Sequence, residues 1–237
     1  GIFYGQNYIS KNNIIIDRRK LANGNAFILG SSGFGKSFAA KHEILSIALS
    51  DSNADIIIID PEAEYSKLIG SLGGQVIKIS STSDNHINAL DINMNYSDSS
   101  NPITLKSEFI LSLCEILLGT LNPIQKSIVD RCTSSVYRNY LQSNYKTTPP
   151  TLVDFHQELL NQPEDEAKDI ALALEIFTNG TLNTFAYQTN VDLNKRIISF
   201  DISELSSQLR ALGMLVVLDS ILNRITKNRA NKRNTYI

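Results

Sequence analysis

Eight consecutive residues combine the groups that a phosphate-binding loop needs. The segment reads Gly30-Ser31-Ser32-Gly33-Phe34-Gly35-Lys36-Ser37, which matches the pattern G-x-x-x-x-G-K-[ST]. Its glycines allow tight turns that point successive backbone N–H groups into a concavity, where phosphate oxygens bind. The Lys36 ammonium would reach the β- and γ-phosphates, and the Ser37 hydroxyl would ligate a bridging Mg²⁺ ion. The motif therefore predicts a site for a nucleotide and Mg²⁺.

The sequence on both sides of the loop fits the motif. Residues 26–29 form an apolar run typical of a buried strand, and apolar residues recur at helical spacing over residues 38–50. A helix that begins at the loop adds the positive end of its dipole to the site. The candidates for binding the nucleotide are Gly30, Ser32, Gly33, Phe34, Gly35, Lys36, Ser37 and Phe38.

Carboxylates follow a second apolar run, the four isoleucines at 56–59. In parallel sheets, ligands bind at the carboxyl ends of the strands. We expect Asp60 to hold Mg²⁺ through water and Glu64 to orient or activate the attacking water. The alternative is that both residues cap the N-terminus of the following helix. The candidate catalytic residues are Lys36, Asp60 and Glu64, and the candidate metal ligands are Ser37 and Asp60.

The elements that would position these residues alternate between strands and helices in the first hundred residues. Strands are expected at 13–17, 25–29, 55–60 and 75–79, and helices at 38–50 and 64–72. Four further helices are expected at 103–118, 123–140, 151–160 and from Pro163 to about 180. A strand at 196–201 and a helix at 205–229 resume the first pattern.

These elements predict an α/β fold with a mostly parallel sheet, interrupted by an all-helical insertion. We expect residues 1–96 and 191–237 to form a nucleotide-binding core, and residues 97–190 to form the insertion. The isoleucine strand follows the first helix directly, which argues against assigning it as the Walker B strand.

Composition limits the partners. The 22 basic and 24 acidic residues give a net charge of −2, so no overall field attracts nucleic acid or an acidic membrane surface. Arg18, Arg19 and Lys20 are expected in a solvated turn, with contact to nucleotide or to a neighbouring subunit as the alternative. The basic cluster at 227–233 is expected to be a solvated helix end. No apolar run approaches the length of a membrane span, and the two cysteines lack metal-like spacing, so we expect a soluble cytoplasmic protein.

Several ordered segments resemble the conjugation ATPases of type IV secretion systems, the VirB/TraC/TrbE/CagE class. They are residues 23–30 (NGNAFILG), 56–65 (IIIIDPEAEY), 73–80 (GGQVIKIS), 88–92 (NALDI), 196–205 (RIISFDISEL) and 209–224 (LRALGMLVVLDSILNR). The resemblance implies a RecA-like motor domain that uses ATP and Mg²⁺. It also implies a homo-oligomer, a hexamer, that docks on membrane-embedded channel components at the cytoplasmic face of the cell membrane. Direct nucleic-acid binding is left open.

The sequence departs from this family at two places. Ala63 stands where relatives usually have glycine, a mild change if the backbone there is not at positive φ. The Walker B Asp-Glu pair is expected just beyond Ile237, so we expect this chain alone to hydrolyse ATP weakly. DNA-pumping motors of the HerA and FtsK group share the Asp-Pro strand end, which keeps a DNA translocase or helicase as an alternative. The second alternative is a scaffold that binds ATP in order to assemble and does not hydrolyse it.

Overall fold

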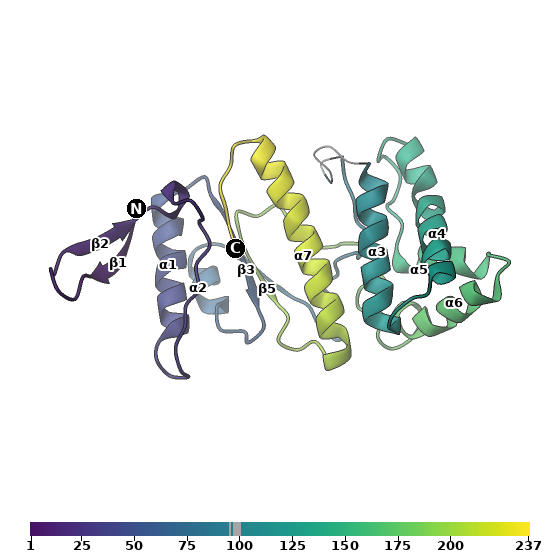
Figure 1. Cartoon of the computed structure of the whole chain (residues 1–237), viewed down its shortest axis with the longest axis horizontal. Helices are drawn as coiled ribbons and strands as arrows, with labels where there is room; N and C mark the ends of the chain where they lie inside the picture. Colours follow the sequence, from purple (N-terminus) through teal and green to yellow (C-terminus); the bar gives the residue numbers. More distant parts are fainter. Residues whose placement is uncertain (95, 97–100) are drawn as a thin grey trace.

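The computed structural model describes residues 1–94, 96 and 101–237, and the chain forms an elongated α/β molecule (Figure 1). Its strands are β1 (Ile2–Gln6), β2 (Asn13–Ile16), β3 (Asp55–Asp60), β4 (Gln75–Lys78), β5 (Ile197–Asp201) and β6 (Thr235–Tyr236). Its helices are the 3-10 helix η1 (Arg18–Lys20), α1 (Lys36–Ser50), α2 (Ser66–Ser71), α3 (Pro102–Leu118), α4 (Pro123–Gln142), α5 (Leu152–Leu160), α6 (Asp165–Thr178) and α7 (Ser207–Ala230).

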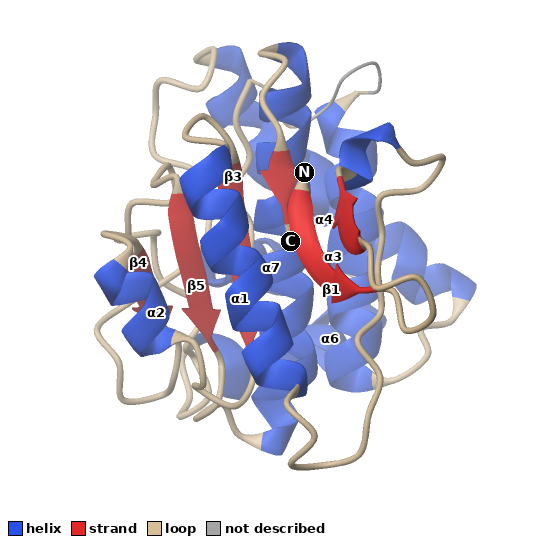
Figure 2. Cartoon of the chain, turned by 90° about the vertical axis from the view of Figure 1, so that its left-hand side faces the viewer, coloured by secondary structure: helices blue, strands red, loops and turns tan. Residues whose placement is uncertain are grey.

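The central sheet is parallel and has the strand order β4-β5-β3-β6. Strands β3 and β5 are paired from Ile56 opposite Ile197 to Asp60 opposite Asp201. Helices α1 and α2 lie on one side of these strands and α7 lies on the other (Figure 2). Because both faces are covered, β3 has to be apolar on both, which is why four isoleucines follow one another.

Alternate isoleucines of β3 belong to different hydrophobic clusters. Ile56 and Ile58 pack in a small cluster that includes Ile47 of α1 and Ile69 of α2. Ile57 points to the opposite face and joins the large cluster. This alternation is the two-residue period of a strand, and it fixes α1, the helix after the phosphate-binding loop, against β3.

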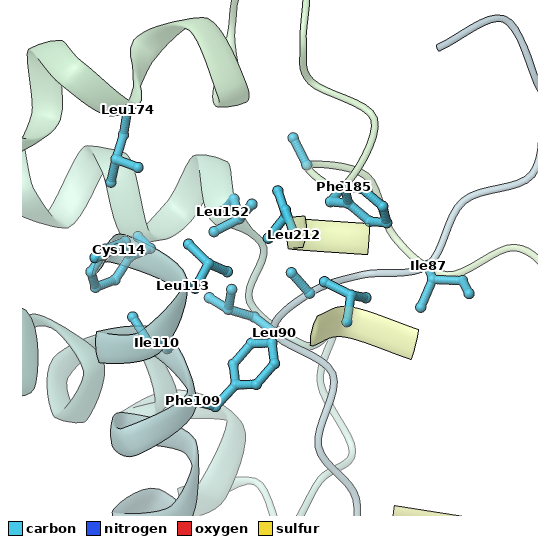
Figure 3. Close-up of a cluster of buried hydrophobic side chains, with 14 of the residues drawn as sticks. Ile87, Leu90, Phe109, Ile110, Leu113, Cys114, Leu152, Leu174, Phe185 and Leu212 are labelled. Atoms are coloured by element: carbon cyan, nitrogen blue, oxygen red, sulfur yellow. The ribbon is translucent and has the colours of Figure 1, made fainter. Parts of the chain in front are cut away.

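Helices α3 to α6 lie at the end of the molecule opposite the β1–β2 hairpin (Figure 1). Among the described residues from 101 to 190 there is no strand. Side chains of these helices share one cluster with α7 and the sheet, and Figure 3 shows Leu113 and Leu152 near Leu212. The helical segment is therefore packed onto the sheet layer through a common hydrophobic core.

The strand expected at 13–17 is present as β2, which pairs antiparallel with β1 in a hairpin separate from the parallel sheet. The strand expected at 25–29 is wrong. Residues 25–29 form no strand, and Phe27 and Leu29 are 90% and 88% exposed rather than buried. Strand β6 pairs with only Asp55 and Ile56 of β3, and residues 25–29 do not pair with the rest of that edge. A cleft of about 840 Å³ separates the rest of that edge from residues 24–28.

None of the helices that the structure describes is both long enough and apolar enough to cross a membrane. Cys114 and Cys132 are free and buried, as expected for cysteines that serve in packing.

Candidate nucleotide-binding site

The phosphate-binding loop enters α1 through two glycines with left-handed backbone conformations. Gly33 has φ of 82°, and Gly35, the residue that caps α1, has φ of 79°. A Cβ atom added to either would meet no heavy atom within 4 Å, so the conformation rather than crowding requires glycine. Successive left-handed turns of this kind turn backbone N–H groups toward a common anion-binding concavity.

Lys36 is the first residue of α1, and its side chain folds back over the loop. Its Nζ donates a hydrogen bond to the carbonyl oxygen of Ser31, at 2.9 Å. A Cβ on Gly30 would lie 3.5 Å from the Lys36 Cγ, so the stem passes close to that glycine. The ammonium is thus held at the mouth of the loop, where a phosphate oxygen could replace the Ser31 carbonyl as its acceptor.

The chemistry of the loop fits a phosphate group. Backbone N–H groups, one ammonium and the Ser37 hydroxyl are donors, and residues 30–37 contain no carboxylate. Ser37 is half-buried in the first turn of α1, which suits a hydroxyl that ligates Mg²⁺ next to bound phosphate. Ser32 is exposed, and Phe34 and Phe38 are 82% and 76% exposed, so both rings are accessible to a ligand at the loop.

Asp60 is fully buried at the end of β3, and the backbone occupies both of its carboxylate oxygens. Oδ1 accepts from the N–H of Glu64 at 3.1 Å, and Oδ2 accepts from the N–H of Tyr65 at 2.9 Å. The carboxylate closes the turn that precedes α2, while α2 itself has no side-chain cap at its N-terminus. A metal role through water stays a prediction. The carboxylate of Glu64 is exposed and has no hydrogen bond to a described residue.

The turn between Asp60 and Tyr65 contains a left-handed alanine. Ala63 has φ of 55°, which is a conformation that favours glycine. The substitution at this position is therefore not mild, and the turn is held in spite of it by the two hydrogen bonds to Asp60. Burial, and then the charges of Glu64 and Asp60, raise the pKa of Tyr65.

Asp60 and Asp201 lie side by side at the carboxyl ends of β3 and β5. The Oδ1 of Asp201 accepts from the N–H and the hydroxyl of Ser203. Helix α1 meets the turn after β3 where Lys41 Nζ lies 5.5 Å from the centre of the Tyr65 ring. Among the described residues, no hydrogen bond or ion pair links Lys36 to Asp60.

The contacts that Arg18 makes with Gly24 and with Glu43 of α1 were not foreseen from the sequence. Arg18 is not solvated as expected, because its guanidinium forms an ion pair with Glu43 of α1 and donates from Nη1 to the carbonyl oxygen of Gly24 at 3.2 Å. Arg19 is half-exposed and pairs with Asp17 at 2.8 Å. No periodicity or motif connects residues 18, 24 and 43, so the sequence carries no signal that would have found this cluster.

A family profile and a solved structure each match most of this chain. The profile of the family described as "Helicase HerA, central domain" matches residues 2–225. No curated protein sequence matches the chain. Among solved structures, the chain resembles the structure of VirB4 of Thermoanaerobacter pseudethanolicus with a TM-score of 0.81 and 23% identity. The match covers 97% of this chain and 65% of the VirB4 chain, so this chain spans less than two thirds of that protein. The predicted RecA-like α/β fold is confirmed.

Proposed function

Because the chain belongs to the family of the helicase HerA central domain, a family of P-loop ATPases, we propose that it is an ATP-binding and ATP-hydrolysing motor domain. The observation that carries the proposal is the loop of residues 30–37 at the start of α1, where left-handed glycines, Lys36 and Ser37 supply the donors for a triphosphate. The division into a core, residues 1–96 and 191–237, and an insertion, residues 97–190, is part of the proposal.

The residues of the loop would act on the phosphates of ATP. Bound Mg²⁺ would supply positive charge that offsets the negative charge of the phosphates. The backbone of residues 30–38 would hold the phosphate chain, and Lys36 would exchange its bond with the Ser31 carbonyl for bonds to phosphate oxygens. Ser37 and Asp60 would hold the ion, Asp60 through water. Glu64, which is exposed at the same side of the sheet, would orient the attacking water.

We further propose that the motor energises conjugative transfer or type IV secretion. The likeness of the fold to VirB4 supports this choice. In such a secretion system, the domain would work as a homo-oligomer, a hexamer. It would lie on the cytoplasmic face of the cell membrane, in contact with membrane-embedded channel components. A DNA translocase is the second candidate, which the description of the family as a helicase favours. DNA-stimulated ATP hydrolysis would support the translocase, whereas nucleotide-dependent assembly without phosphate release would indicate a scaffold.

The nucleotide site is tested by Lys36→Ala. Removal of the ammonium takes away a charge-assisted contact to the phosphates, so affinity for Mg-ATP should fall by at least about 100-fold while the fold is kept. Isothermal titration calorimetry measures the affinity, and circular dichroism checks the fold. Lys41→Ala removes a lysine of the same helix that lies over Tyr65 instead, and it should bind ATP as the original chain does. Undiminished binding by Lys36→Ala would refute the site.

A further inference from the structure

The segment that leads into the phosphate-binding loop is attached to the rest of the protein by very few polar contacts. Among the described residues, one hydrogen bond joins residues 24–30 to the chain before residue 23, and it runs from Arg18 Nη1, six residues earlier, to the carbonyl oxygen of Gly24. The other bond of this segment, from the N–H of Asn25 to the Asn23 side chain, is local. The position of the segment therefore depends on Arg18.

The same guanidinium holds α1. Arg18 Nη2 forms an ion pair with Glu43 Oε1, and the two side chains are 21% and 12% exposed. Glu43 lies in the second turn of the helix that the loop opens. Arg18 thus contacts Gly24, in the segment that leads to the loop, and Glu43, in the helix that follows the loop. A lysine could not do this equally well, because only the planar guanidinium presents two donors in a fixed relation.

Glu43 has a second partner, which connects the pair to the N-terminal hairpin. The hydroxyl of Tyr4 in β1 donates to Glu43 Oε1 at 2.6 Å. Tyr4, Glu43 and Arg18 therefore form a continuous chain of contacts from β1 to Gly24, which we call the Arg18 cluster. Through it, the hairpin, α1 and the segment before the loop keep one relative position.

We propose that Arg18 and Glu43 are positioning residues for the phosphate-binding loop. By holding Gly24 to α1, they limit how far the segment that enters the loop can move from the helix that leaves it, which keeps the loop's N–H groups and Lys36 directed at phosphate. This proposal rests on the proposed function, because a loop that binds no nucleotide needs no such alignment. Binding groups displaced by a fraction of an ångström lose affinity even when every group is present.

The proposal is tested by Arg18→Gln and Glu43→Gln in the 237-residue chain, with Mg-ATP as the probe. Each variant should weaken binding by about tenfold, and the double variant should be no weaker than either single one, since each change breaks the same contact. Arg19→Gln is the matched control, because it makes the same charge change at the adjacent residue and affects only the pairs with Asp17 and Asp51. Its affinity should stay within about twofold of the original.

Two measurements separate positioning from a general loss of structure. Thermal unfolding of Arg18→Gln should stay cooperative, and hydrogen exchange should become faster in residues 24–35 while α3 to α6 remain protected. If Arg18→Gln does not fold, Arg18→Lys replaces it, and it should still bind ATP more weakly because it holds one partner instead of two.

Each result decides between the two proposals. Affinity equal to that of the original chain in both Arg18 and Glu43 variants would overturn the positioning role while Lys36→Ala still lost binding, and the nucleotide site would then stand alone. An equal loss in Arg19→Gln would also overturn it, since a general charge effect would explain the data. If the original chain bound no ATP, both the proposed function and the positioning role would fall.

Discussion

Ala63 illustrates how one residue can carry a cost that the sequence does not reveal. Its φ of 55° places the Cβ where it crowds the backbone, and this conformation costs a residue other than glycine about 1–2 kcal/mol. The turn persists because Asp60 accepts hydrogen bonds from the N–H groups of Glu64 and Tyr65. The glycine that the resembled family usually has at this position therefore suits the left-handed conformation that the turn requires.

Ala63→Gly should stabilise the protein. Glycine relieves the strain but adds flexibility to the unfolded chain, so the net gain is expected to be about 0.5–1 kcal/mol. Urea unfolding followed by circular dichroism measures the change. Ala39→Gly, at an exposed position inside α1, is the control and should destabilise by about 1 kcal/mol. A lower midpoint for Ala63→Gly would mean that the left-handed conformation is absent.

At the scale of elements, helices with local start signals were predicted well. Asn122 accepts from the N–H of Gln125 while the Gln125 side chain accepts from the Asn122 N–H, both at 2.9 Å, and the same reciprocal capping occurs at Thr151. The apolar run of β3 was assigned to its true bounds, Asp55–Asp60. These signals lie within a few residues of each other, so they are legible in the sequence without knowledge of the fold.

Elements that depend on distant partners were predicted badly. Residues 25–29 have the composition of a strand, but a strand needs a neighbour for its backbone groups, and none of the described strands pairs with them. Arg233, expected at a solvated helix end, pairs with Asp55, whose side chain is 1% exposed. Arg224 pairs with the same carboxylate at 2.6 Å. The pairing of one buried aspartate with two arginines depends on the tertiary structure, so the sequence alone does not reveal it.

The β1–β2 hairpin gives a prediction about pH. Burial, and next the hydrogen bond to Glu43, raise the pKa of Tyr4 from 10.0 to about 12 in the folded protein. A pKa raised by folding means that the contribution of Tyr4 to stability is complete below pH 10 and is lost between pH 10 and about 12. Tyr4→Phe lacks this contribution, so it should unfold at a lower temperature at pH 8, and the difference from the original chain should disappear as the pH approaches 12.

The control for this measurement is Tyr8→Phe, in the turn of the same hairpin, where the side chain is 86% exposed. It should follow the original chain at every pH. A difference between Tyr4→Phe and the original chain that stays constant from pH 8 to 12 would show that the hydroxyl of Tyr4 does not hold the hairpin to α1.

At the scale of the whole molecule, the helical segment α3 to α6 shares a hydrophobic core with the sheet and α7. A buried ion pair also joins α3 to α7. Lys106 of α3 has no exposed side-chain surface, and its Nζ lies 2.8 Å from Asp219 Oδ2 of α7. The ammonium also lies 4.0 Å from the centre of the Phe109 ring and 5.1 Å from that of Tyr96. Burial lowers the pKa of Lys106, and the nearby Asp219 opposes that shift. The charge on α3 therefore depends on a carboxylate of α7.

Asp219→Asn tests whether this junction makes the molecule one cooperative unit. The change leaves the buried Lys106 without its counter-charge, and the free energy of unfolding should fall by about 3 kcal/mol. If helices α3 to α6 and the sheet unfold together, far-ultraviolet circular dichroism and tyrosine fluorescence should give coincident midpoints, both shifted by the same amount. Asp165→Asn removes the acid of an exposed pair with Lys168 and should change stability by less than about 0.5 kcal/mol. Separate midpoints in Asp219→Asn would mean that the helical segment folds independently of the sheet, and unchanged stability would mean that Lys106 is not held by Asp219.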